Sequence, residues 1–184
     1  IMSDHGQVSP AHDMPYWGEI SGVNIVAMEE LGYTVMKTDE AGNKLPEIDW
    51  SKTRAVAQRE GHIYLNIKGR NKHVVDGEII EGIVDPKDQY EVEEDIMTAL
   101  YGYKDKVTGK RVIAMALRNK DAVLLGMGGP ESGDIVYWMA EGYNYDHCDS
   151  LSTAYGEQGT SSSPIFIAAG SGIKKGVKTN RVIR

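Results

Sequence analysis

The chain has 184 residues, of which 41% are hydrophobic and 26% are charged, as expected for one folded domain with a sizeable core. Asp and Glu outnumber Lys and Arg by 27 to 20, and the basic residues are scattered, which disfavours nonspecific nucleic-acid binding. No apolar run reaches the roughly 18 residues that span a membrane, and no signal-peptide pattern opens the chain, although the compartment stays open. Cys148 is the single cysteine, which excludes an intrachain disulfide and a cysteine-rich zinc site.

Hydrophobic periodicity predicts the elements in the first part of the chain. Apolar side chains at helical spacing predict a helix over 17–31 that ends at Gly32. Polar residues predict a turn at 39–44. Strands are expected at 33–37, 54–58 and 63–68.

The second half contains the strongest helix pattern, at 88–103, with acidic residues at its start and one apolar face. Strands are expected at 111–117 and 134–139. The segment 119–126 is ambiguous. The stretch 142–163 is long and polar, and long irregular loops in compact domains are often functional. The continuous apolar run at 164–170 predicts a strand that is covered on both faces.

Strands interleaved with helices imply an α/β sandwich, in which ligands collect beyond the carboxyl ends of the strands. At the start of the chain, an apolar strand end delivers Asp4 and His5 side by side into a glycine turn. Carboxylate oxygen and neutral imidazole nitrogen together suit Zn²⁺ and Mn²⁺. Asp-His-Gly recurs often by chance, so a simple turn with a surface histidine is the alternative.

Five motifs follow one another along the chain: SDHG at 3–6, IYLNIKGR at 63–70, GIVDP at 82–86, GDIV at 133–136 and PIFIAAGSGIKKG at 164–176. In number, order and spacing, these motifs resemble the type I phosphodiesterase and nucleotide pyrophosphatase family of the alkaline phosphatase superfamily. The resemblance covers nearly the whole chain.

The resemblance implies a three-layer α/β/α sandwich of alkaline phosphatase type that holds two divalent metal ions, with zinc first and manganese as the alternative. It implies phosphoryl or sulfuryl transfer through a Thr or Ser nucleophile, with a small-molecule phosphate ester or a nucleotide as substrate. In that family the Asp-His-Gly pair ligates the ion that activates the nucleophile, and Asp4 and His5 match these positions. The two ions would stabilise the attacking and leaving oxygens of an in-line displacement.

The resemblance also implies segments that this chain does not show. The family's nucleophile, an aspartate near its first strand and a further Asp and His would all precede Asp4. We therefore expect one domain over 1–184, the C-terminal part of a larger phosphodiesterase, with a cap-like insertion within about residues 40–145. Because the chain lacks the nucleophile segment, hydrolysis by this chain alone is not expected.

The sequence departs from the family at one further metal ligand. The family places a His-Gly pair shortly before its last core strand, where this chain has Tyr155 and Gly156. Neutral tyrosine is a poor zinc ligand, because its phenol has a reference pKa near 10. His147 lies in the same loop and is the candidate substitute. Alternatively, His147 makes only surface hydrogen bonds with its acidic neighbours.

Other polar residues have weaker claims to a function. Surface positions are expected for His12, His62 and His73. Asn66, Lys68 and Arg70 form a polar cluster in which Arg70 could bind a phosphate through two hydrogen bonds. Solvation at the surface is the expectation that we favour for all three.

The leading hypothesis is a metal-dependent hydrolase of phosphodiester or nucleotide pyrophosphate bonds. Another phosphatase, a sulfatase or a phosphomutase of the same superfamily would differ only in the ester that it cleaves. A noncatalytic α/β interaction module is the alternative of a different class, and the tyrosine at position 155 favours it.

Overall fold

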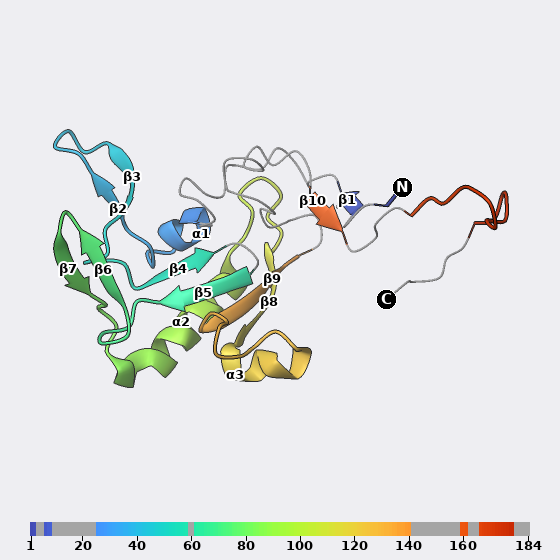
Figure 1. The fold of residues 1–184 in the computed structure, drawn as a ribbon. Coiled ribbons are helices and arrows are strands. Elements are labelled where there is room, and N and C mark those ends of the chain that lie inside the picture. Colours follow the sequence, from blue (N-terminus) through green and yellow to red (C-terminus); the bar gives the residue numbers. More distant parts are fainter. Residues whose placement is uncertain (3–5, 9–24, 59–60, 141–158, 162–165, 179–184) are drawn as a thin grey trace.

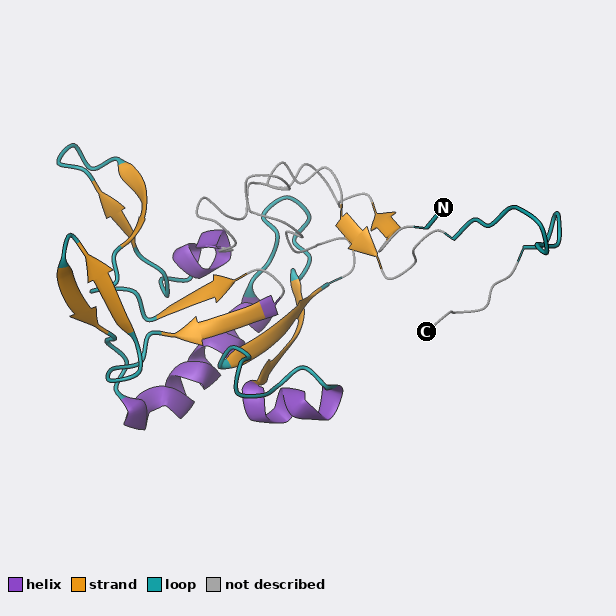
Figure 2. Ribbon diagram, viewed as in Figure 1, coloured by secondary structure: helices purple, strands orange, loops and turns teal. Residues whose placement is uncertain are grey.

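The computed structural model describes residues 1–2, 6–8, 25–58, 61–140, 159–161 and 166–178 (Figure 1). The helices are α1 (Ile25–Glu30), α2 (Gln89–Gly102) and α3 (Asn119–Ala122), and the short 3-10 helices are η2 (Pro86–Asp88) and η3 (Val123–Leu125). The strands are β1 (Gly6–Val8), β2 (Met36–Thr38), β3 (Lys44–Ile48), β4 (Ala55–Gln58), β5 (His62–Leu65), β6 (Lys72–Val75), β7 (Glu78–Glu81), β8 (Ile113–Arg118), β9 (Ile135–Met139) and β10 (Gly159–Ser161). The chain is therefore a mixed α and β protein (Figure 2).

None of the described helices combines the length and the apolar character needed to cross a membrane.

The central sheet has four strands in the order β4-β5-β9-β8, and each neighbouring pair is antiparallel. Helix α2 packs against β8, and α1 packs against β4 (Figure 1). The remaining pairs among the described residues are β1 with β10, β2 with β3, and β6 with β7, and all three are antiparallel. The sheet, α1 and α2 thus form one packed unit.

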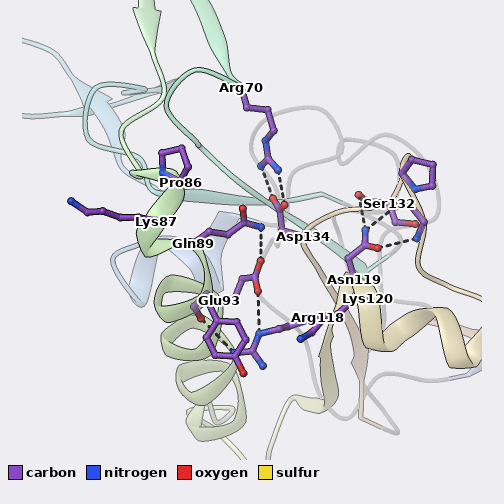
Figure 3. Close-up of a pocket in the computed structure, with 13 residues that line it drawn as sticks. Arg70, Pro86, Lys87, Gln89, Glu93, Arg118, Asn119, Lys120, Ser132 and Asp134 are labelled. Carbon is purple, nitrogen blue, oxygen red and sulfur yellow. Dashed lines mark hydrogen bonds and ion pairs between the residues drawn. The ribbon is translucent and has the colours of Figure 1, made fainter.

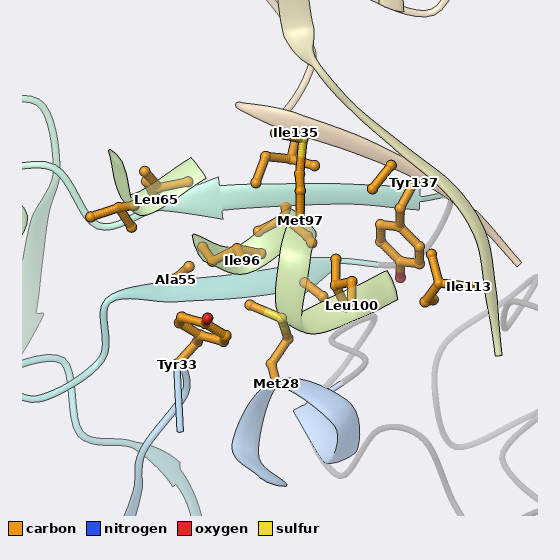
Figure 4. Close-up of a cluster of buried hydrophobic side chains, with 14 of the residues drawn as sticks. Met28, Tyr33, Ala55, Leu65, Ile96, Met97, Leu100, Ile113, Ile135 and Tyr137 are labelled. Atoms are coloured by element: carbon orange, nitrogen blue, oxygen red, sulfur yellow. The ribbon is translucent and has the colours of Figure 1, made fainter. Parts of the chain in front are cut away.

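The main core lies between one face of this sheet and the two helices (Figure 4). In β5, Ile63 and Leu65 are fully buried and alternate with the half-buried Tyr64, which is the alternation that the sequence predicted. Ile96 of α2 and Met28 of α1 are fully buried in the same cluster. Each such side chain contributes about 1.5–3 kcal/mol by leaving water.

A smaller core covers the opposite face of β4 and β5. Val56 and Tyr64 point to this side because strand side chains alternate between faces. They pack with Met36 and Ile48 of the β2–β3 hairpin and with Trp50 just after it. Both faces of β4 and β5 are therefore covered, one by helices and one by a hairpin.

Most of the predicted elements are confirmed where the structure describes them. The strands expected at 54–58, 63–68, 111–117 and 134–139 correspond to β4, β5, β8 and β9, and the helix expected at 88–103 corresponds to α2. The first predicted helix is described from Ile25 and ends as expected: Gly32 adopts φ 79° and donates its N–H to the Glu29 carbonyl at 2.9 Å. The ambiguous segment forms α3 and η3, and the strand expected from residue 33 begins later, at Met36.

The β6–β7 hairpin was not predicted. Its two-residue turn is Asp76-Gly77, with φ angles of 53° and 83°, and Val75 lies opposite Glu78. Two positive φ angles in succession match the tight hairpin turn for which Asp-Gly is a preferred sequence. The hairpin lies beside β2 and β3 in Figure 1.

The prediction of a doubly covered strand at 164–170 is wrong for the residues that the structure describes. Phe166 and Ile167 are 63% and 55% exposed, and Phe166 makes only an isolated bridge with Met2. A continuous apolar run satisfies the pattern of a buried strand, but burial also needs covering layers. The described part of the chain places none against Phe166 and Ile167, so their side chains face solvent.

Gly82 lies so close to a neighbouring backbone that a side chain there is expected to destabilise the fold. A Cβ at this position would lie 2.4 Å from the carbonyl oxygen of Ile67. Gly82→Ala should therefore lower the free energy of unfolding by about 3 kcal/mol, because backbone must move to admit the methyl group. Gly102→Ala is the control, since Gly102 ends α2 with open space around it, and a change within about 1 kcal/mol is expected. Equal urea midpoints for the two variants would contradict this close approach.

Candidate functional site

The predicted metal ligands Asp4, His5 and His147 lie outside the described residues, as do Tyr155 and Cys148. Within the described ranges, no group of three or more His, Cys, Asp or Glu side chains is placed to hold a metal ion. The metal site therefore stays a prediction from the sequence.

Residues on either side of Asp4 and His5 are described and paired. Met2, just before the first motif, forms an antiparallel bridge with Phe166 of the motif at 164–176. Gly6, the last residue of the first motif, lies in β1 opposite Ser161 in β10, just before the motif at 164–176. Two motifs from opposite ends of the sequence are thereby neighbours.

Arg70 forms an ion pair with Asp134 through two parallel hydrogen bonds. Nη1 and Nη2 of Arg70 each lie 2.7 Å from one carboxylate oxygen of Asp134, and Asp134 also accepts the Leu65 backbone N–H at 2.7 Å. The bond to Asp134 raises the pKa of Arg70 above its ordinary value. Arg70 is exposed, as expected, but its guanidinium fork is paired with Asp134 and so holds the turn after β5 to the start of β9.

Asn66 is buried, so the expectation that it is solvated at the surface is wrong. Its Nδ2 donates to the carbonyl oxygens of Trp50 and Thr53 at 3.1 and 2.9 Å, and its backbone carbonyl accepts the N–H groups of Ile83 and Val84. The side-chain amide thus satisfies carbonyls that would otherwise be buried without partners. Lys68 is exposed, as expected.

His73 lies in β6 and is half buried, so the surface position expected for it is wrong. Its ring stacks on Trp50, with 3.7 Å between ring centroids, and its Nε2 lies 2.8 Å from Asn66 Oδ1. Because Asn66 Nδ2 is committed to two carbonyls, its Oδ1 faces His73 and must accept. His73 Nε2 therefore carries the proton, and burial lowers the pKa of His73 below its ordinary value.

The lowered pKa predicts how the stability depends on pH. The neutral ring is favoured in the folded state, so the contribution of His73 is fully present above the unfolded pKa of about 6.5 and is lost as pH falls through the lower folded value. His73→Gln removes this titration. We expect the unfolding free energy of the variant to fall less between pH 7.5 and about pH 5 than that of the wild type, as measured by urea unfolding. Identical pH dependence in both proteins would contradict the neutral assignment.

The motif at 63–70 contacts two other motifs. Lys68 N–H donates to the Val84 carbonyl at 2.8 Å, and Ile67 and Val84 form a parallel bridge. Together with the ion pair between Arg70 and Asp134, these contacts join the motifs at 63–70, 82–86 and 133–136. The five motifs thus form two groups of neighbours, one in the body of the fold and one at the paired ends of the chain.

A pocket of about 650 Å³ opens beside the Arg70–Asp134 pair (Figure 3). Four segments form it: the turn after β5, the start of α2, the junction of β8 with α3, and the loop before β9. The charged residues that line it are Arg70, Lys87, Glu93, Arg118, Lys120 and Asp134. Figure 3 shows Arg70 facing Asp134, and Gln89, Glu93 and Arg118 joined in a chain of interactions.

Arg118 is the second paired arginine of the pocket. Its Nε lies 3.1 Å from Glu93 and its Nη2 2.5 Å from Glu94. Its guanidinium carbon also lies 3.8 Å from the centroid of the Tyr90 ring, within the range of a cation–π contact. Gln89 donates to the remaining oxygen of Glu93 at 2.7 Å. Arg118 therefore holds α2 to the end of β8.

Asn119 fixes the opposite wall of the pocket. Its side chain donates to the carbonyls of Gly129, Ser132 and Gly133 and accepts the N–H of Gly129 at 3.0 Å. A Cβ on Gly128 would lie 2.2 Å from the Asn119 carbonyl oxygen, so the loop lies directly on α3. The wall is thus held by hydrogen bonds and by contact with backbone.

His62, at the start of β5, has a structural contact and does not line this pocket. Its Nδ1 accepts the Gly133 N–H at 3.3 Å. Among the described residues that line the pocket there is neither histidine nor cysteine, and the Ser132 hydroxyl donates to the Met127 carbonyl.

The contacts of Arg70, Asn66 and His73 could not be found from the sequence, because their partners are distant in the chain and no local pattern marks them. No protein-family model, no curated protein and no solved structure matches this chain.

Proposed function

We propose that this chain is part of a metal-dependent hydrolase of phosphodiester or nucleotide pyrophosphate bonds, built on the three-layer sandwich of alkaline phosphatase type. In this proposal Asp4 and His5 hold one divalent ion and His147 contributes to the other. Carboxylate oxygen and imidazole nitrogen are donors that suit Zn²⁺, with Mn²⁺ as the alternative. Such ions supply Lewis-acid stabilisation of the oxygens of the phosphoryl group.

The observation that carries the proposal is the mutual contact of the motifs that resemble this family. Arg70 and Asp134 are 64 residues apart and belong to different motifs, yet they form a bidentate ion pair. Met2, next to the first motif, pairs with Phe166 in the last motif. Motifs that resemble one family and also lie together in space support a shared fold more strongly than scattered matches would.

Parallel assays of ester hydrolysis test the proposal. The full-length protein, including any sequence that precedes Ile1, is supplied with zinc and given p-nitrophenyl esters of three kinds: a phosphodiester, a phosphomonoester and a sulfate. We expect the phosphodiester to be cleaved fastest. If the monoester or the sulfate is cleaved fastest, the proposed activity changes from phosphodiesterase to another hydrolase of the superfamily. No cleavage of any ester would favour the noncatalytic module.

A further inference from the structure

The pocket beside Arg70 and Asp134 exposes positive charge and buries its negative charge. Its two carboxylates, Glu93 and Asp134, are only 8% and 9% exposed. The side chains of Arg70 and Lys87 are 44% and 76% exposed, and Lys120 is exposed as well. A ligand that enters the pocket therefore meets cations first.

The buried carboxylates are also fully engaged. Both oxygens of Asp134 accept from Arg70, and one accepts Leu65 N–H in addition. The two oxygens of Glu93 accept from Gln89 and Arg118. A cationic ligand would have to compete with these internal donors at buried positions, which is costly. The pocket is therefore unsuited to a cation.

The lysines are more available than the arginines. Arg70 and Arg118 are held by carboxylates, whereas the Lys87 ammonium lies 3.4 Å from the half-exposed Asp85 carboxylate. Among the described residues, no carboxylate lies within ion-pair distance of Lys120, whose ammonium is 5.5 Å from the centroid of the exposed Tyr90 ring. Lys120 thus supplies the charge that is least neutralised by the protein itself.

We propose that this pocket binds a small polyanion, of the phosphate or carboxylate class, with Lys120 as its principal charge partner and Lys87 as a second. A volume of about 650 Å³ is of the size that holds small-molecule ligands. The walls are fixed by Arg118 and Asn119, so little ordering is needed when the ligand binds. A local excess of positive charge is notable because the whole chain has a formal charge of −7.

Calorimetric titration of the 184-residue chain tests the proposal, with inorganic pyrophosphate in one arm and citrate in the other. The protein is first freed of divalent ions on a chelating resin, and the buffer has low ionic strength and contains no other polyanion. We expect binding that weakens as salt is added. Lys120→Gln should weaken it about fivefold, the equivalent of about 1 kcal/mol, and Lys87→Gln should also weaken it but by less. Lys110→Gln removes the same charge outside the pocket lining and should change the affinity less than twofold.

If pyrophosphate binds and citrate does not, the pocket is specific for phosphate groups. If both bind equally, the pocket recognises negative charge without distinguishing phosphate from carboxylate. The proposal is overturned if neither anion binds, or if Lys110→Gln weakens binding as much as Lys120→Gln. The inference goes beyond the proposed hydrolysis. Because binding is measured on protein that has been freed of divalent ions, failure of binding and failure of metal-dependent cleavage are separate results.

Discussion

Asp134→Ala is expected to lower the free energy of unfolding by about 3 kcal/mol, because it leaves Arg70 without its bidentate partner and Leu65 N–H without its acceptor. Asp134 is only 9% exposed, so water replaces these hydrogen bonds poorly. Arg70 is 44% exposed, which keeps the expected loss below that of a fully buried pair. Urea unfolding monitored by circular dichroism gives the measurement.

Two further variants separate the ion pair from the loss of a side chain. Asp134→Asn keeps the shape and one acceptor oxygen, and its loss should lie between those of the wild type and the alanine variant. Asp121→Ala removes an exposed carboxylate in α3 and should change the stability by less than about 0.5 kcal/mol. If Asp134→Ala is as mild as Asp121→Ala, the pair does not hold β5 to β9.

The second large effect concerns the proposed metal ligands. In the full-length protein, Asp4→Ala and His5→Ala should each lower the rate of phosphodiester cleavage at least about 1,000-fold, because the loss of a metal ion removes several kcal/mol of transition-state stabilisation. Bound zinc, measured by elemental analysis, should fall in parallel. Asp13→Ala is the matched control, since it removes a nearby carboxylate that the proposal does not use.

The same measurements decide between His147 and Tyr155. If His147 is a ligand, His147→Ala lowers zinc content and rate, whereas Tyr155→Phe leaves both within about twofold. The opposite pattern would transfer the role to Tyr155. Wild-type zinc content in Asp4→Ala or in His5→Ala would remove that residue from the metal site.

The sequence predicted the elements whose side chains are buried in a regular pattern. Ile63 and Leu65 alternate with polar neighbours, and Ile96 and Leu100 lie on one face of α2, so periodicity located both elements. Strand β3 is not predicted from the sequence, because Pro46 and the charged Lys44 and Glu47 are typical of a continued turn. Regular burial is visible in a sequence, whereas an edge strand with mostly exposed side chains is not.

The sequence of the β6–β7 hairpin contains a turn signal but lacks a strong strand pattern. Asp76-Gly77 is a preferred sequence for a two-residue hairpin turn, and the flanking residues alternate only weakly. For the same reason the sequence does not indicate that His73, in β6, stacks on Trp50. A turn signal without strong apolar periodicity therefore still identifies a hairpin.

The contacts at the candidate site were beyond prediction from local pattern. The Arg70 guanidinium can bind a phosphate through two hydrogen bonds, and in the structure it makes two such hydrogen bonds to Asp134 instead. The choice between an internal carboxylate and an external anion depends on which residue folds beside Arg70, 64 positions further along the chain. Spacing along the sequence contains no information about such a pair.

The central claim is metal-dependent phosphodiester cleavage, and its most direct test is the initial rate of bis-(p-nitrophenyl) phosphate hydrolysis by the full-length protein. The rate is measured before chelation, after removal of divalent ions, and after zinc or manganese is restored. We predict that cleavage is lost on chelation and returns with the metal. Cleavage that continues unchanged without metal, or no cleavage in the presence of either metal, would contradict the account.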